Sequence, residues 1–349
     1  MTKKISDIDK NLKIATDIQE NDIVFYNVND EPFGIYGVNY DKNEGKFLRM
    51  PQDIAKRVNP GVEFLNSHTS GGRVRFKTDS KYVAIKVISK TSGFMPHMAL
   101  SGSSGFDMYT KGENGYTYEA TFMPYNVYKK FEENQGYENI IYFSDSKTRD
   151  ITINFPLYNE VCSLYIGLEK DALLESGESY RTEKPVVFYG SSITQGGCAS
   201  RPGNAYANIL SRRYDFDFIN LGFSGSGMGE AEIAEYIANL DMSAFIYDYD
   251  YNAPDAEHLK KTHKPMFDII RKVHPDIPII IMSKPTLKLD GDNTERKEII
   301  KETYEIAKAN GDKNVYFIPG NEIFKIFGND SCTVDGCHPN DLGFMCMAE

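Results

Sequence analysis

A short apolar stretch that ends in serines and glycines constrains this chain more than any other part of its sequence. Residues Val186–Gly190 are apolar and partly β-branched, which predicts a buried strand that stops at its glycine. Ser191 and Ser192 follow, and a helical pattern begins near residue 204. Because open α/β sheets place their ligands at the carboxyl ends of the strands, Ser192 is a candidate nucleophile. An ordinary Gly/Ser turn is the alternative at this point.

The rest of the second half, residues 181–349, continues the alternation of strands and helices. Apolar runs predict strands at 186–190, 216–221, 244–249, 278–282 and 315–318, and 3.6-residue periodicity predicts helices at 204–214, 230–240, 255–273 and 294–310. Such alternation is typical of parallel sheets built from βαβ units. We therefore expect a flavodoxin-like α/β/α domain with a parallel sheet of about five strands.

The first half, residues 1–180, has a different pattern. It predicts one helix at 52–58 and strands at 34–40, 73–78, 82–87, 106–109, 116–122, 139–143 and 150–154. Many short strands joined by Gly, Asn and Asp turns indicate an antiparallel β-sandwich, here jelly-roll-like. The polar stretch 174–184 interrupts both periodicities and marks the expected domain boundary.

Charge and composition exclude several classes of partner. The net charge of -11 argues against a nucleic acid or an anionic membrane as the main partner. The longest aliphatic run, 277–282, is far too short to span a bilayer, and we find no secretory signal pattern. Five cysteines without framework spacing fit free thiols in a reducing cytoplasm. Cys332, Cys337 and His338 lack a second ligand pair at zinc-finger spacing, so we expect neither a metal nor a cofactor.

Polar and small residues stand where the predicted strands end. Ser192 follows the first strand, a glycine-rich loop at 222–227 follows the second, Asn252 follows the third, and Asp335 and His338 follow the last. A serine needs a base near neutral pKa, and His338 can act as that base. Asp335 can fix the tautomer of the histidine and stabilise the imidazolium formed on attack. The set thus predicts a nucleophile, oxyanion donors and a base with its orienting acid.

These four segments resemble the ordered sequence blocks of the SGNH/GDSL hydrolase family. The resemblance implies that Ser192 is the nucleophile, and that Gly225 and Asn252 join the Ser192 N–H in the oxyanion hole. It also implies a Ser192–His338–Asp335 triad that needs no metal. The sequence Gly105–Tyr109 is similar to the G-x-D-L-Y element of an N-terminal domain fused to some of these hydrolases.

The chain departs from the family pattern at three places. Ser191 stands where the family usually has Asp, and only Asn252 remains of the third block. The sequence reaches only a short way past His338, so we expect a short final helix. A partner chain could cover its apolar face, which leaves a homo-oligomer possible.

The resemblance to carbohydrate acetylesterases suggests the substrate class. We expect a serine esterase that removes small acyl groups, most often acetyl, from oligosaccharides or other small metabolites. The loops at 94–98 and 105–109 are then candidates for a wall of the binding groove. Asp107 could bind a sugar hydroxyl, and Tyr109 could present an apolar face to a sugar. The alternative is that Asp107 satisfies turn backbone and Tyr109 packs inside the sandwich. His68 and His97 lack acidic neighbours in the sequence and are assigned no chemistry.

Two other function classes remain open from the residues alone. The glycine-rich segment 225–229 lies between a predicted strand and a predicted helix, and Asp248 or Asp250 lies about where a ribose-binding acid belongs. This pattern permits a dinucleotide-binding oxidoreductase, which would leave Asp335 and His338 unexplained. A non-catalytic carbohydrate-binding protein is the second alternative.

Overall fold

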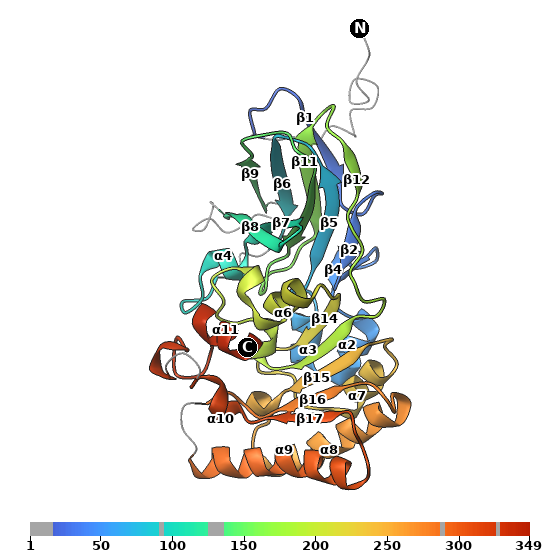
Figure 1. Ribbon diagram of the computed structural model, residues 1–349, viewed down its shortest axis with the longest axis vertical. Coiled ribbons are helices and arrows are strands. Elements are labelled where there is room, and N and C mark those ends of the chain that lie inside the picture. The colour runs from blue at the N-terminus through green and yellow to red at the C-terminus, as the bar shows by residue number, and fades with distance from the viewer. Residues whose placement is uncertain (1–16, 91–93, 125–135, 287–289, 326–328) are drawn as a thin grey trace.

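The computed structural model describes residues 17–90, 94–124, 136–286, 290–325 and 329–349. Figure 1 shows two antiparallel sheets at one end of the molecule and a parallel sheet flanked by helices at the other. The C-terminus lies beside the parallel sheet, close to helix α11 (Asp341–Ala348). The mixed α/β architecture predicted from the sequence is confirmed.

The N-terminal half is a sandwich of two antiparallel sheets. One sheet has the strand order β1-β11-β6-β9, and the other has the order β12-β5-β10-β7-β8 with β2 paired to β5. Their bounds are β1 Ile23–Asn27, β2 Gly34–Tyr36, β5 Arg73–Thr78, β6 Tyr82–Ile88, β7 Phe106–Gly112, β8 Gly115–Phe122, β9 Gly136–Tyr142, β10 Arg149–Asn154, β11 Ser163–Glu169 and β12 Leu174–Ser176. Alternate side chains of both sheets, such as Val74, Phe76, Val83 and Ile85, meet in one core. A sandwich buries one face of each sheet in this way.

The C-terminal half carries a five-stranded parallel sheet in the order β14-β13-β15-β16-β17. The strands are β13 Val186–Gly190, β14 Phe218–Gly222, β15 Ala244–Asp248, β16 Ile279–Met282 and β17 Val315–Ile318. The helices are α5 Ser192–Gln195, α6 Tyr206–Tyr214, α7 Ala231–Ala238, α8 Ala256–Val273, α9 Gly291–Ala309, α10 Gly320–Ile323 and α11, with 3-10 turns η2 Pro202–Asn204, η3 Asp250–Asn252 and η4 Asn329–Ser331. This order is flavodoxin-like, as predicted, and it puts β13 beside the point where the order reverses.

The two faces of β13 are covered by different helices. Val187 and Tyr189 pack in the core that contains residues of α7, α8 and α9. Val186 and Phe188 face the other way, into the core formed with α6 and α11. A strand buried on both faces reads as a continuous apolar run, which is why the sequence predicted it.

Two short helices of the first half belong to the core of the second half. Helix α2 (Gln52–Val58) was predicted, whereas α3 (Pro60–Leu65) was not. Ala55, Val62 and Leu65 are buried in the same core as Val187. The hydrophobic cores therefore do not divide at residue 180, because α2 and α3 cover one side of the α/β layer.

Several other elements differ from their predicted bounds. The predicted strand at 34–40 is split into β2 and β3 (Asn39–Asp41), which pairs with β4 (Lys46–Leu48), because Gly37 turns the chain with a φ of 72°. The helix predicted to begin at residue 294 begins at Gly291, where Asp290 caps it by accepting a hydrogen bond from the Asn293 N–H. Strands β1, β11 and β12 were missed, although Leu164, Ile166 and Leu168 of β11 alternate and face the core.

The final helix does not leave its main apolar side chains uncovered. Phe344, Cys346 and Ala348 of α11 are buried, and the ring of Phe344 stacks on Tyr206 of α6 with 6.4 Å between centroids. The expected uncovered apolar face is therefore largely absent from this helix. Oligomerisation stays a prediction. Among the described residues, no helix combines the length and the apolar character needed to cross a bilayer.

Candidate active site

The residue predicted as the nucleophile lies at the first turn that follows strand β13. Ser192 opens helix α5, and the Ser191 side chain caps this helix by accepting a hydrogen bond of 3.1 Å from the Ile193 N–H. The turn requires a glycine at its base. A Cβ on Gly190 would overlap Thr194 Oγ1 and the carbonyl oxygen of Asp248. Ser192 is only 7% exposed, so its hydroxyl is held at a defined place beside the sheet edge.

The structure brings Ser192, His338 and Asp335 into one hydrogen-bonded chain. Ser192 Oγ lies 3.0 Å from His338 Nε2, and His338 Nδ1 lies 2.8 Å from Asp335 Oδ2. Asp335 and His338 come from the same loop, three residues apart, just before α11. A nucleophile, a base and an acid at these distances have the geometry of a catalytic triad.

The carboxylate of Asp335 is held in its ionised form. Partial burial would raise the pKa of Asp335, but hydrogen bonds from the His338 side chain and from the backbone N–H groups of His338 and Cys337 lower it to about 2. The two backbone bonds to Oδ1 measure 2.8 Å and 3.0 Å. An ionised carboxylate accepts from Nδ1–H, so the proton of His338 stays on Nδ1 and Nε2 is left to accept from the serine hydroxyl.

The two other predicted site residues lie on neighbouring loops. Gly225 is exposed in the loop after β14 and has a φ of 66°. Asn252 ends the turn η3 after β15, and its Nδ2 donates a 2.7 Å hydrogen bond to the Phe223 carbonyl of the same β14 loop. A Cβ on Gly227 would contact both Asn252 Nδ2 and the Gly190 carbonyl oxygen, which shows how closely this loop approaches the end of β13. The roles of Gly225 and Asn252 as oxyanion donors stay predictions.

A buried carboxyl group lies beneath the nucleophile turn. Asp248 Oδ2 accepts from Thr194 Oγ1 at 3.1 Å and from Tyr206 Oη at 3.3 Å. Burial raises the pKa of Asp248 to about 8, although the hydrogen bonds from Thr194 and Tyr206 oppose this shift. The group is therefore largely protonated at neutral pH, and little negative charge lies under the serine. Sequence reasoning did not find this role for Asp248.

Burial also excludes the dinucleotide-binding alternative, because neither candidate ribose-binding acid is accessible to a ligand. Asp248 is 0% exposed and Asp250 is 1% exposed. Asp250 also accepts from the Lys284 N–H at 2.9 Å and pairs with Arg296. Neither carboxylate can reach a ribose, so the glycine-rich segment 225–229 is a loop of the active edge and not a dinucleotide site.

Side chains of the N-terminal domain donate hydrogen bonds to the first and last carbonyl groups of helix α5. Tyr158 Oη donates to the Ser192 carbonyl oxygen at 3.1 Å, and Ser70 Oγ donates to the Gln195 carbonyl oxygen at 2.5 Å. Gln195 Nε2 in turn donates to the Leu157 carbonyl oxygen at 3.1 Å. These contacts, made to both ends of the four-residue helix, fix the nucleophile turn to the sandwich. Tyr158 carried no sequence signal for this role.

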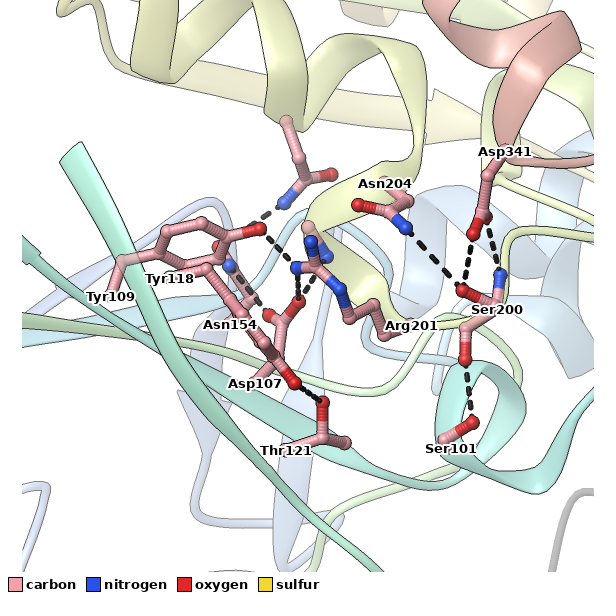
Figure 2. Close-up of polar contacts among 12 residues, drawn as sticks. Ser101, Asp107, Tyr109, Tyr118, Thr121, Asn154, Ser200, Arg201, Asn204 and Asp341 are labelled. Carbon is pink, nitrogen blue, oxygen red and sulfur yellow. Dashed lines mark hydrogen bonds and ion pairs between the residues drawn. The ribbon is translucent and has the colours of Figure 1, made fainter.

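The structure corrects the expectation that Asp107 and Tyr109 contact the substrate. Asp107 is 0% exposed and Tyr109 is 3% exposed. Figure 2 shows Asp107 between Asn154 and Arg201: Oδ1 accepts from Asn154 Nδ2 at 2.8 Å, and Oδ2 accepts from Arg201 Nη1 at 2.8 Å. Oδ2 also accepts from the Gly203 N–H at 2.8 Å, and Arg201 donates to the Tyr109 hydroxyl. The pair anchors the loop after the nucleophile instead of binding a sugar.

The same loop is tied to the helix that follows the base. Ser101 Oγ in α4 (Leu100–Ser103) donates to the Ser200 carbonyl oxygen at 2.6 Å. Ser200 N–H in turn donates to Asp341 Oδ1 of α11 at 2.8 Å (Figure 2). The loop after the nucleophile thus connects α4 of the N-terminal half to the helix that follows His338.

In the loop at 94–98, His97 does reach the site. The ring of His97 lies with its centroid 5.5 Å from that of His338, at an interplanar angle of 53°. His97 is exposed and lies in the loop at 94–98, which was predicted to border the groove. Sequence reasoning assigned it no chemistry, because its neighbour in space is far away in the chain.

Comparison with known protein families agrees with this arrangement. Residues 183–349 match the model of the GDSL-like lipase/acylhydrolase family, and residues 23–174 match the model of the N-terminus of SGNH-hydrolase-type esterases, called GxDLY. A search of the curated proteins found no match.

Solved structures share the fold over nearly the whole chain. A protein from Bacteroides ovatus described as a GDSL-like lipase is 29% identical, with a TM-score of 0.80 and coverage of 93% of this chain and 94% of that one. The salicylyl-acyltransferase SsfX3 from a tetracycline biosynthetic pathway is 19% identical, with a TM-score of 0.75 and coverage of 95% and 96%. A family two carbohydrate esterase from Clostridium thermocellum, in complex with cellohexaose, is 14% identical, with a TM-score of 0.57 and coverage of 90% and 96%.

Proposed function

We propose that this chain is a carboxylic ester hydrolase of the GDSL-like lipase/acylhydrolase family, whose model matches residues 183–349, and that it cleaves small acyl esters through an acyl-enzyme on Ser192. The observation that carries the proposal is the hydrogen-bonded chain from Ser192 Oγ through His338 to Asp335, with distances of 3.0 Å and 2.8 Å. This chain gives a weakly nucleophilic hydroxyl a base within reach.

The reaction follows from the positions of these atoms. Ser192 Oγ attacks the ester carbonyl carbon while its proton passes to His338 Nε2, and Asp335 stabilises the imidazolium. The tetrahedral intermediate collapses as His338 returns the proton to the alcohol that leaves. Water then attacks the acyl-serine with His338 as base, and the carboxylic acid departs as Ser192 regains its proton.

The oxyanion formed in both steps needs hydrogen-bond donors. As the first residue of α5, Ser192 has an N–H with no acceptor inside the helix. Asn252 Nδ2 uses one hydrogen for the Phe223 carbonyl and keeps the second for a ligand. The Gly225 N–H is the third donor in this proposal. Each such donor typically contributes about 3–4 kcal/mol to transition-state stabilisation.

Access of water favours hydrolysis over transfer to another alcohol. The side chains of His338 and Asp335 are 24% and 38% exposed, so bulk water can reach the base. The described N-terminal loop at 94–98 reaches His338 through His97 and does not bury it. In an acyl transferase the second step would instead require an acceptor hydroxyl that excludes water from this position.

Carbohydrate acetyl esters are the substrates we propose. The likeness in fold to carbohydrate esterases, one of them in complex with cellohexaose, supports this class. Two exposed aromatic rings on segments of the N-terminal half add a second argument. Phe94, three residues before His97, is 63% exposed, and Phe64, which packs edge-on against His68, is 67% exposed. Flat exposed rings next to a polar site can stack on sugar faces.

The test compares two serine substitutions in the purified full chain. Ser192→Ala should abolish cleavage of aryl acetates and of acetylated oligosaccharides, the latter followed by mass spectrometry. Ser243→Ala is the matched control, because Ser243 precedes β15 at the amino end of the parallel strands, away from Ser192, and its hydroxyl donates to the Pro185 carbonyl oxygen. Wild-type turnover by Ser192→Ala would refute the acyl-enzyme. Faster turnover of long-chain than of acetyl esters would refute the acetyl preference.

A further inference from the structure

Three side chains with metal-binding atoms meet beside the nucleophile. His97 comes from the N-terminal domain, Cys198 follows helix α5, and His338 is the proposed base. One ligand atom of each residue lies within 4.8 Å of the corresponding atoms of the other two. The three residues come from parts of the chain that are far apart in sequence, so only the tertiary fold creates the group.

The donor set selects a particular kind of cation. Two imidazoles and one thiol are ligands for borderline to soft metals such as Zn²⁺, and they suit Mg²⁺ or Ca²⁺ poorly. With Zn–N and Zn–S bonds of about 2.0–2.3 Å, ligand atoms in a tetrahedral site lie about 3.5 Å apart. The ligand atoms therefore need to approach one another by at most about 1.3 Å. His97 is exposed, which lets its side chain make most of that movement.

Asp335 holds the ring of His338 in an orientation that suits metal binding. Asp335 Oδ2 accepts from Nδ1 at 2.8 Å, which leaves Nε2 as the nitrogen able to bind a cation. A carboxylate behind a histidine is the arrangement that orients metal-binding imidazoles and raises their basicity. Nε2 is also the atom that accepts from Ser192 Oγ at 3.0 Å. A cation and the serine hydroxyl therefore compete for the same lone pair.

We propose that His97, Cys198 and His338 form a site for a Zn²⁺-like cation, and that the bound cation inhibits the hydrolase by taking Nε2 of His338 from Ser192. The inhibition rests on the proposed function, whereas the binding does not. On binding, Cys198 loses its thiol proton to solvent, three protein ligands coordinate the metal, and water fills a fourth position. The site joins the two domains, because His97 belongs to the sandwich and the other ligands to the hydrolase layer.

Binding is tested first, without reference to activity. Titration of the chelator-treated full chain with Zn²⁺ in a calorimeter should show one site per chain, and Co²⁺ should give a thiolate charge-transfer band. His97→Ala and Cys198→Ala should each weaken binding by roughly 100-fold or more, since even outer-shell changes cost 10–100-fold. The matched control is Cys337→Ala, because Cys337 is the thiol next to His338 in sequence and lies outside the group. Thermal melts verify that each variant is folded.

Inhibition is tested next with an aryl acetate, as the ratio of turnover with and without Zn²⁺ in each variant. This ratio should fall for the wild type at the concentrations that saturate binding and stay near one for His97→Ala. Equal affinity of the wild type, His97→Ala and Cys198→Ala for Zn²⁺ would overturn the site. Binding at this site without inhibition would overturn the competition with Ser192.

The Ser192→Ala variant separates this inference from the proposed function. It lacks the hydroxyl that competes for Nε2, so it should bind Zn²⁺ at least as tightly as the wild type. If this variant kept full esterase activity, the proposed function would fail while the cation site stood. If it bound Zn²⁺ more weakly than the wild type, the competition would be refuted whatever its activity.

Discussion

Replacing Asp107 with alanine tests whether the contact between the domains is structural. Asp107 is fully buried and accepts hydrogen bonds of 2.8 Å from Asn154, Arg201 and the Gly203 N–H. Alanine removes the acceptor and leaves the guanidinium of Arg201 without its carboxylate. The loop between the nucleophile and α6 then loses its anchor on the sandwich.

The size of the effect follows from the burial of this ion pair. Breaking a buried pair by removing one partner costs about 3–5 kcal/mol. The Arg201 side chain keeps 21% exposure, so water can solvate part of the stranded charge and the lower figure applies. For a cooperative unit of about 150–250 residues, each 1 kcal/mol lowers the melting temperature by about 2–4 °C. A loss of about 3 kcal/mol therefore predicts a decrease of roughly 6–12 °C.

Calorimetry and kinetics together distinguish a structural role of Asp107 from a substrate-binding role. Asp145→Ala is the control, because Asp145 forms an ion pair with Arg149 on the surface of the same domain, where its side chain is 39% exposed. Its melting temperature should change little. We expect Asp107→Ala to lose kcat/KM equally on an aryl acetate and on an acetylated oligosaccharide. An unchanged melting temperature with a selective loss on the oligosaccharide would refute the structural role and restore Asp107 as a sugar ligand.

Four further predictions concern three residues of the hydrolase layer. Asp335→Asn should keep the fold but lower kcat by about 10⁴, because the amide favours the wrong tautomer of His338, and an aryl acetate assay checks this. The pKa of Asp335 is lowered to about 2, so its ionisation stabilises the fold above about pH 4, and this contribution is lost as the pH falls through 2. The difference in melting temperature between the wild type and Asp335→Asn should therefore shrink as the pH falls from about 4 to 2. The pKa of Asp248 is raised to about 8, so its protonated form stabilises the fold at low pH and this contribution is lost as the pH rises from about 4 through 8. Over that range, thermal melts should show the melting temperature of Asp248→Asn rising relative to that of the wild type. A constant difference between the two melting temperatures would contradict the buried neutral acid. Gly190→Ala should abolish activity or soluble expression, because its Cβ would overlap Thr194 and the backbone of Asp248, and wild-type activity would show that the turn can relax.

The parts of this protein that could be predicted from sequence are those fixed by local patterns. Strand β13 was predicted because both of its faces are buried, which makes its sequence uniformly apolar. Asp335 and His338 could be paired because three residues separate them on one loop, and their interaction needs no other part of the fold. The order of the parallel strands follows from right-handed βαβ connections, which leave few topologies.

What could not be predicted depends on partners distant in the chain. Asp107 looks like an accessible acid in a glycine-rich loop until the fold brings Arg201 against it. His97 has no acidic neighbour in sequence, and only the docking of the sandwich places it beside His338. The pKa of Asp248 depends on complete burial, which no local pattern reveals for a single acid after a strand.

The packing of helices α2 and α3 on the far layer bears on the order in which the chain folds. Ala55, Val62 and Leu65 share their core with Val187, which the ribosome adds more than a hundred residues later. While only the first half has been synthesised, this apolar surface has nothing to pack against. Such a surface on a nascent chain is a target for chaperones and for aggregation. Synthesis that stops near residue 180 would therefore leave a fragment in which the apolar side chains of α2 and α3 lack their packing partners.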